Sequence, residues 1–142
     1  MKSETSVEPL EAAPAKRWML VDDSEDILMM LSAMVEHLTG ALVECHISPA
    51  AALAAFAASP NDYKLVITDY DMPGMNGMEL CRRLQALCPA QKIILATGSG
   101  YFTAAAARAA GFSALLHKPY PMSALQVALE TAGFKERIGC AA

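Results

Sequence analysis

The 142-residue chain lacks a long hydrophobic run and lacks an excess of positive charge. Its longest uncharged stretches, 48–61 and 93–107, contain proline or glycine and fall short of about 18 to 20 strongly apolar residues, so we expect no transmembrane helix. The formal net charge of −4 argues against a dedicated binder of nucleic acid or of anionic membranes. The first fifteen residues carry three glutamates and no apolar core, which excludes a secretory signal.

Cysteine and histidine are also scarce. The four cysteines have no CxxC spacing, and the three histidines are not spaced as metal ligands. In a chain without an export signal, such cysteines indicate reduced thiols in the cytoplasm rather than a disulfide framework or a zinc site.

What the chain has in abundance is apolar residues, at 54%, arranged in a regular alternation of short strands and helices. We expect strands at 18–21, 41–45, 65–67, 92–96 and 113–116, and helices at 24–39, 48–58, 78–87, 101–110 and 121–131. Strands that alternate with helices predict an α/β fold, in which a doubly wound parallel sheet is covered by helices on both faces. The predicted organisation is a flexible tail at 1–16, one folded domain at 17–133 and a C-terminal tail at 134–142.

Polar residues follow four of the five predicted strands at the point where each strand ends. Asp22 and Asp23 follow the first strand, Asp69 the third, Thr97 the fourth and Lys118 the fifth. Because parallel strands end at the same edge of a sheet, all five side chains are expected to converge there, which is where such sheets bind ligands.

Three carboxylates in one cleft repel one another, so at least one of them should have a raised pKa. A divalent cation would relieve the repulsion, and oxygen ligands without histidine or cysteine favour Mg²⁺, with Mn²⁺ as a substitute. Lys118 adds an ammonium and Thr97 a hydroxyl, which suit the oxygens of a phosphoryl group. The simplest chemistry is that one aspartate is the nucleophile and becomes an aspartyl phosphate.

These residues lie in four motifs that together resemble the response regulator receiver domain of two-component signalling. The motifs are Val21-Asp22-Asp23, Thr68-Asp69 with the segment 72–77, Ala96-Thr97-Gly98 and Lys118-Pro119. The resemblance covers about residues 17–132 and implies a flavodoxin-like (βα)₅ fold with a five-stranded parallel sheet of order 2-1-3-4-5.

The resemblance also implies a role for each motif residue. Asp69 would be the phosphoacceptor, and it would bind Mg²⁺ through its side chain together with Asp23. Asp71 would bind the cation through its backbone carbonyl and Asp22 through a metal-bound water. Thr97 would hydrogen-bond the phosphoryl group and Lys118 would pair with it, positioned by a cis peptide bond before Pro119. The domain would have no enzymatic activity beyond slow loss of its own phosphate.

The chain departs from the family pattern at one position. Receivers often have a switch aromatic three residues before the lysine, where this chain has Leu115. Either the switch is absent, or Tyr101 or Tyr120 takes a related role. Asp71 and Ser99 occupy positions at which the family tunes the loss of phosphate.

After Lys118-Pro119 only one helix and a short segment remain, so we expect a stand-alone cytoplasmic receiver without an output domain. It would take phosphate from a histidine kinase or a histidine phosphotransfer protein. It would then bind a downstream protein through the face formed by 101–110, 113–116 and 121–131. Two alternatives stay open: a receiver-fold interaction module that does not depend on phosphorylation, and the isolated receiver domain of a hybrid histidine kinase.

Overall fold

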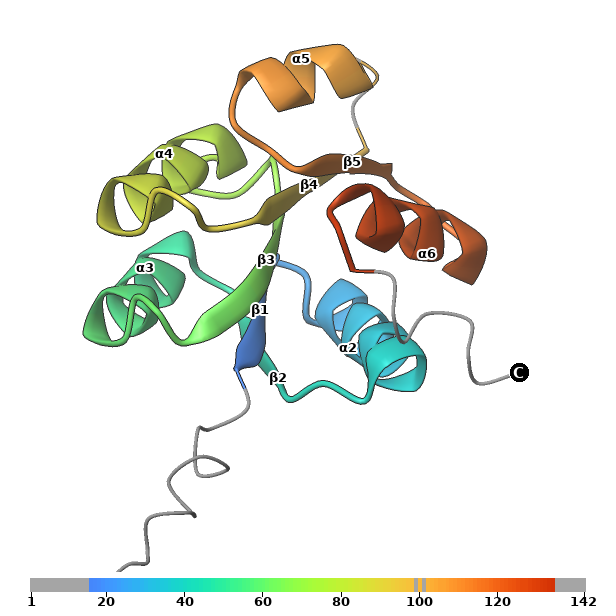
Figure 1. The fold of residues 1–142 in the computed structure, drawn as a ribbon, viewed down its shortest axis with the longest axis horizontal. Coiled ribbons are helices and arrows are strands. Elements are labelled where there is room, and N and C mark those ends of the chain that lie inside the picture. Colours follow the sequence, from blue (N-terminus) through green and yellow to red (C-terminus); the bar gives the residue numbers. More distant parts are fainter. Residues whose placement is uncertain (1–15, 99, 101, 135–142) are drawn as a thin grey trace, which may run out of the picture.

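The computed structural model describes residues 16–98, 100 and 102–134, which form a single sheet flanked by helices (Figure 1). The strands are β1 (Arg17–Val21), β2 (Val43–His46), β3 (Tyr63–Asp69), β4 (Ile93–Thr97) and β5 (Ala114–His117). The helices are α2 (Glu25–Thr39), α3 (Pro49–Ala58), α4 (Gly77–Leu87), α5 (Ala104–Ala109) and α6 (Met122–Thr131). None of these helices combines the length and apolarity needed to cross a membrane.

The sheet has the order β2-β1-β3-β4-β5, and every neighbouring pair of strands is parallel. In the central register, Leu20 of β1 lies opposite Cys45 of β2 and Ile67 of β3. In Figure 1, α2 and α6 lie on one side of the sheet and α3 and α4 on the other. The predicted fold class, a doubly wound parallel sheet of order 2-1-3-4-5, is therefore confirmed.

The core consists of two apolar layers, one on each face of the sheet. In β1, Trp18 and Leu20 belong to the layer under α2 and α6, whereas Met19 and Val21 belong to the layer under α3, α4 and α5. This alternation follows from the two-residue period of a strand. Because both faces are covered, all four side chains are buried, which explains why this strand is continuously apolar.

Capping side chains determine where the helices begin. Ser24, Ser48 and Asn76 each accept a hydrogen bond from a backbone N–H in the first turn of α2, α3 and α4. Each bond satisfies a donor that has no partner inside the helix. At the other end of α2, Gly40 adopts the left-handed conformation (φ 70°) that residues with a Cβ atom disfavour.

The elements differ from the sequence-based prediction by one to three residues at their ends, and two of these differences have a local cause. The prediction placed β2 at 41–45, but it spans Val43–His46, because Ala41 bonds to the end of α2 through the Thr39 hydroxyl. The helix predicted at 101–110 begins only at Ala104, where the Thr103 hydroxyl caps it; Tyr101 lies outside the described residues.

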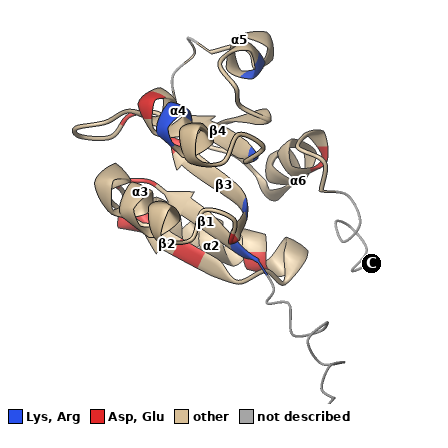
Figure 2. Cartoon of the chain, turned by 60° about the vertical axis from the view of Figure 1, so that its left-hand side comes forward, with Lys and Arg blue, Asp and Glu red and all other residues tan. Residues whose placement is uncertain are grey.

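The charge on the helices is unevenly distributed (Figure 2). Helix α4 carries both signs, with Arg82 and Arg83 paired to Glu79, whereas α5 is alanine apart from Arg108. With one fully buried residue, Ala107, α5 has few apolar contacts, which is typical of weakly anchored elements.

Within the described residues, packing against the core reaches Phe134, one residue beyond the predicted domain. Phe134, which the prediction placed in the C-terminal tail, packs its ring against Trp18 with the ring centroids 5.3 Å apart. The Lys92 ammonium lies over the same ring, 5.1 Å from its centroid. The core therefore extends to this residue.

Candidate functional site

The carboxyl edge of the sheet brings together the acidic residues that follow β1 and β3. These strands are neighbours, and Val21 lies opposite Thr68, so Asp22 and Asp69 end up side by side. One carboxylate oxygen from each of Asp22, Asp23 and Asp69 lies within 4.8 Å of the other two. Asp22 and Asp69 are buried, whereas Asp23 is exposed to solvent.

Lys118 reaches this acidic cluster from the end of β5. Its Nζ lies 2.7 Å from Asp22 Oδ2 and 3.2 Å from Asp69 Oδ1. The peptide bond between Lys118 and Pro119 is cis, as the resemblance implied, and the Lys118 N–H donates to the Thr97 carbonyl at 2.9 Å. A single ammonium is thus shared by two buried carboxylates.

The second oxygen of Asp22 is held by the start of α2. Asp22 Oδ1 accepts a hydrogen bond of 2.9 Å from the Ser24 N–H. Ser24 in turn caps α2 through its hydroxyl, so the residues that begin the helix also orient the carboxylate. A carboxylate at a helix N-terminus is favoured by the helix dipole.

The pKa values of Asp69 and Lys118 reflect their burial and the charges around them. Burial raises the pKa of Asp69, the charge of Asp22 raises it further, and Lys118 offsets only part of the shift. For Lys118, burial lowers the pKa, but the hydrogen bond and the charge from Asp22, together with Asp69, outweigh it, so its pKa is raised. The prediction of at least one carboxylate with a raised pKa is confirmed at Asp69.

The donor set fits a hard divalent cation. Three carboxylates converge, and no histidine or cysteine is among them. Burial and the charge of Asp22 raise the pKa of Asp69, and Lys118 is the one ammonium that opposes them. An added positive charge would therefore relieve the repulsion between the carboxylates. Asp71, the fourth predicted ligand, follows β3 on the exposed loop before α4.

Gly77 lets α4 approach the backbone of Asp69 closely, a role that the sequence did not reveal. A Cβ atom at Gly77 would lie 2.4 Å from the Asp69 carbonyl oxygen, well inside the contact distance. The Gly77 N–H donates to the Tyr70 carbonyl at 2.9 Å, which closes the loop that carries Asp71. From sequence, this glycine is indistinguishable from an ordinary turn residue.

The remaining predicted residues lie on both sides of the sheet. Thr97 is fully buried at the end of β4, next to the strand that carries Asp69. Leu115 packs on the α3–α4–α5 side, but Tyr120 belongs to the layer under α2 and α6. Tyr120 therefore does not take the position of the usual switch aromatic, because the sheet separates it from Leu115. Tyr101 and Ser99 lie outside the described residues.

Comparison with known proteins agrees with this arrangement. A family model described as the response regulator receiver domain matches residues 19–130. The chain belongs to this family. Receiver domains of this family act in two-component signalling and bind Mg²⁺ through acidic residues.

The curated relatives of this receiver domain are longer regulators and sensors. The virulence sensor protein BvgS of Bordetella bronchiseptica is 36% identical, with a match that covers 86% of this chain and 11% of that protein. The transcriptional regulatory protein FixJ of Azorhizobium caulinodans is 32% identical, with 78% of this chain and 51% of that protein covered. The chain therefore spans about half or less of the length of these relatives.

Solved structures show the same fold. A response regulator receiver domain protein from Clostridium thermocellum is 29% identical and superposes with a TM-score of 0.74, covering 82% of this chain and 93% of that one. A structure titled FixJ-N is 31% identical with a TM-score of 0.71, and the match covers 87% of this chain and 97% of that one.

Proposed function

We propose that this receiver domain accepts a phosphoryl group on Asp69 from a histidine kinase or a histidine phosphotransfer protein. The observation that carries the proposal is the shared ammonium of Lys118, which lies within 3.2 Å of two buried carboxylates at the carboxyl edge of the sheet. At that edge the proposed nucleophile, the Asp69 carboxylate, lies beside the ammonium of Lys118, and phosphoryl transfer requires such a pair.

In the reaction, a carboxylate oxygen of Asp69 forms the new P–O bond as the P–N bond to the donor imidazole breaks. The released imidazole nitrogen takes its proton from solvent. Lys118 neutralises the phosphoryl oxygens, and the Thr97 hydroxyl donates a hydrogen bond to one of them.

The side chains of Asp23 and Asp69 and the backbone carbonyl of Asp71 would hold Mg²⁺ or Mn²⁺, with Asp22 acting through a bound water. When bound, the cation supplies positive charge that offsets the charge of the phosphoryl oxygens and of the acidic cluster.

Acetyl phosphate with Mg²⁺ tests this proposal by intact-protein mass spectrometry. We expect the mass of one phosphate to be added, only when Mg²⁺ is present, and no addition in Asp69→Asn. Asp71→Asn is the matched control, because it changes a nearby acidic side chain but keeps the backbone carbonyl, so it should still be phosphorylated. An unmodified wild type would favour the phosphorylation-independent module, and a modified Asp69→Asn would move the acceptor to another residue.

Loss of phosphate is proposed to be slow and to be the only reaction that the domain catalyses by itself. The Asp71 carboxylate lies on the loop that follows the acceptor, where it can orient or repel an attacking water. Timing the decay of the phosphorylated mass in wild type and Asp71→Asn measures this effect. An unchanged lifetime would exclude a role for this side chain.

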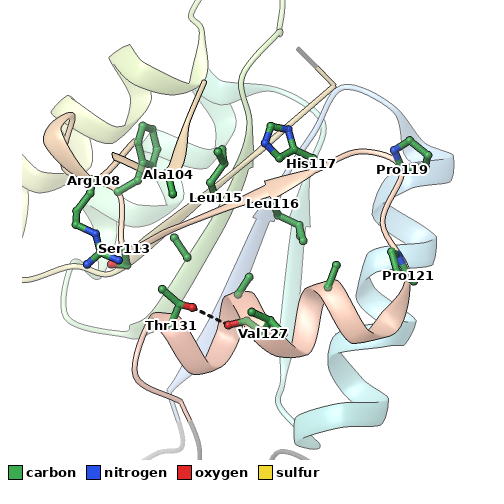
Figure 3. A pocket seen from close by; sticks show the side chains of 14 residues that line it. Ala104, Arg108, Ser113, Leu115, Leu116, His117, Pro119, Pro121, Val127 and Thr131 are labelled. Carbon is green, nitrogen blue, oxygen red and sulfur yellow. Dashed lines mark hydrogen bonds between the residues drawn. The ribbon is translucent and has the colours of Figure 1, made fainter. Parts of the chain in front are cut away.

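We also propose that the signal leaves through a groove between α5 and α6. The groove has a volume of about 500 Å³, lies over β5 and is lined by Arg108, Leu115 and Val127 among others (Figure 3). His117, which also lines it, is the last residue of β5 and immediately precedes Lys118. A new charge of about −1.5 to −2 on Asp69 would pull on Lys118 and hence on this strand.

Backbone NMR of the protein with Mg²⁺ and beryllofluoride, a mimic of the phosphoryl group, tests this route. We expect the amide signals of α5 and β5 to move together with those of the acidic site. Shifts confined to the acidic site would contradict signalling through the groove.

The match to BvgS favours a second candidate, in which this receiver is part of a longer sensor protein. That match covers 86% of this chain. An immunoblot of the source cells separates the two readings, because a free receiver migrates near 15.1 kDa and a hybrid sensor at several times that mass.

A further inference from the structure

The hydroxyl of Tyr120 is buried without a hydrogen-bond partner. Among the residues that the structure describes, Tyr120 Oη is the only buried side-chain polar atom in this situation, and the residue is 7% exposed. Buried tyrosine hydroxyls nearly always find a partner, because leaving one unpaired costs free energy. A phenylalanine would fill the same space without that cost, so the hydroxyl needs an explanation.

The ring of Tyr120 lies in the core layer on the α2 and α6 side of the sheet. It packs in the same core layer as Leu20 and Leu28, which belong to the two elements on either side of Asp22. In the chain, Tyr120 comes two residues after Lys118, beyond the cis peptide bond. Burial raises the pKa of Tyr120 to about 12, with further contributions from the charges of Asp22 and Asp69. The hydroxyl therefore lies within electrostatic reach of both carboxylates and remains a donor at neutral pH.

Asp22 is the carboxylate that can use this donor. Its Oδ1 accepts from the Ser24 N–H, and its Oδ2 accepts from Lys118 Nζ. If Lys118 turns to a phosphoryl group on Asp69, Asp22 loses the ammonium as a donor while it stays buried, and a metal-bound water remains. A buried carboxylate that loses a charged donor is destabilised, so a further donor has a clear role.

We propose that Tyr120 is a positioning residue of the site, whose hydroxyl donates to Asp22, directly or through a single water, when Lys118 engages the phosphoryl group. This inference rests on the proposed function. It explains why the hydroxyl of Tyr120 has no partner in this structure: its acceptor, Asp22, becomes available only in the phosphorylated state.

Tyr120→Phe tests the role by removing one oxygen atom. The matched control is Tyr63→Phe, because Tyr63 is also buried but its hydroxyl donates to Glu44, away from the acidic site. We expect Tyr120→Phe to bind beryllofluoride about fivefold more weakly at saturating Mg²⁺, the equivalent of one ordinary hydrogen bond. Without Mg²⁺ its melting temperature should be unchanged or higher, since the removed hydroxyl had no partner. Tyr63→Phe should show the reverse: a lower melting temperature and unchanged affinity.

NMR of protein labelled with ¹³C at the tyrosine Cζ gives a second measurement that a purely structural role would not affect. The chain has four tyrosines, and the signal that is missing in Tyr120→Phe identifies Tyr120. We expect this signal to shift on addition of Mg²⁺ with beryllofluoride, and the Tyr63 signal to stay in place. Equal beryllofluoride affinity in Tyr120→Phe and wild type, or an unmoved Tyr120 signal, would overturn this inference alone. A wild type that binds no beryllofluoride would overturn the proposed function together with it.

Discussion

At the amino ends of β1 and β3, Arg17 lies between Asp62 and Glu44, whereas at the carboxyl ends of the same strands Asp22 and Asp69 share Lys118. Arg17 donates to Asp62 through Nε at 3.0 Å and to Glu44 through Nη1 at 2.6 Å. Glu44 also accepts the Tyr63 hydroxyl at 2.9 Å, and its Oε2 lies 2.7 Å from His46 Nε2. The amino edge therefore supplies several donors to each carboxylate.

The difference between the two edges appears in the pKa values of Glu44 and Asp69. Burial raises the pKa of Glu44, but hydrogen bonds with His46 and Tyr63 and the charge of Arg17 outweigh it, so the pKa falls below its usual value. Burial raises the pKa of Asp69, and the surrounding donors do not compensate. A carboxylate with enough donors stabilises the fold, whereas one with too few is left able to bind a cation or a phosphoryl group.

Of the changes considered, replacing Lys118 should lower the stability of the protein the most. In Lys118→Met, the buried carboxylates of Asp22 and Asp69 lose their shared ammonium, and removing one partner of a buried pair is strongly destabilising. We expect the free energy of unfolding to fall by about 2 kcal/mol without metal, a value reduced because Lys118 is partly exposed. Urea unfolding in EDTA measures this loss, and repeating it with Mg²⁺ should give a smaller one. Equal stability of variant and wild type in EDTA would show that the ammonium is not needed there.

The amino edge should be less sensitive, because its charges have several partners. In Glu44→Gln, we expect the free energy of unfolding at pH 7 to fall by about 1 kcal/mol, the net value of a charged hydrogen bond less what the neutral amide retains. Phosphorylation by acetyl phosphate should stay at the wild-type rate, since Glu44 lies outside the acidic site. A loss of phosphorylation in this variant would show that the two edges are coupled.

The contribution of Glu44 should depend on pH with a defined sign. Because its pKa in the folded state lies below the unfolded value, its stabilisation is present above the unfolded pKa of about 4.3 and is lost as the pH falls through the folded pKa. The stability gap between wild type and Glu44→Gln should therefore be constant above pH 6 and close towards pH 3. If the stability difference between wild type and Glu44→Gln instead grew in acid, the pKa of Glu44 would be raised rather than lowered in the folded protein.

Asp69→Asn should stabilise the protein, although it abolishes the proposed acceptor. The folded-state pKa of Asp69 is raised, so its ionised form costs more free energy in the folded than in the unfolded protein, and a neutral isostere relieves that cost. We expect the free energy of unfolding at pH 7 in EDTA to rise modestly. Urea unfolding of Asp69→Asn beside Glu44→Gln checks that the two changes have opposite signs. A destabilised Asp69→Asn would mean that Lys118 compensates Asp69 fully.

The smallest effect is expected on the surface of α4, where Arg82 pairs with Glu79 in solvent. In Arg82→Gln, we expect no measurable change in the urea midpoint, because exposed pairs contribute little and Glu79 keeps Arg83 at 2.8 Å. This variant separates the effect of charge burial at the two edges from the effect of charge alone.

Local signals were enough to predict the helices, the strands and hence the α/β class, whereas the strand order came from the family resemblance. The apolar period, the caps at Ser24 and Ser48 and the stop at Gly40 all act within a few residues, so they can be read along the chain. The start of the helix before Gly111 was misplaced because alanine continues a helical pattern in either direction, and only Thr103 marks where capping begins.

Which residues converge at the carboxyl edge follows from the sequence alone, because parallel strands end together and each polar residue follows directly on its strand. How these residues pair depends on the three-dimensional packing. Lys118 and Asp22 are 96 positions apart, and Arg17 and Asp62 are 45 apart, distances over which no sequence period carries information. The faces of the sheet to which Tyr120 and Leu115 belong, and the close approach of Gly77 to Asp69, follow from how helices pack across the sheet. Packing of this kind depends on the whole core, so it could not be read from any single segment.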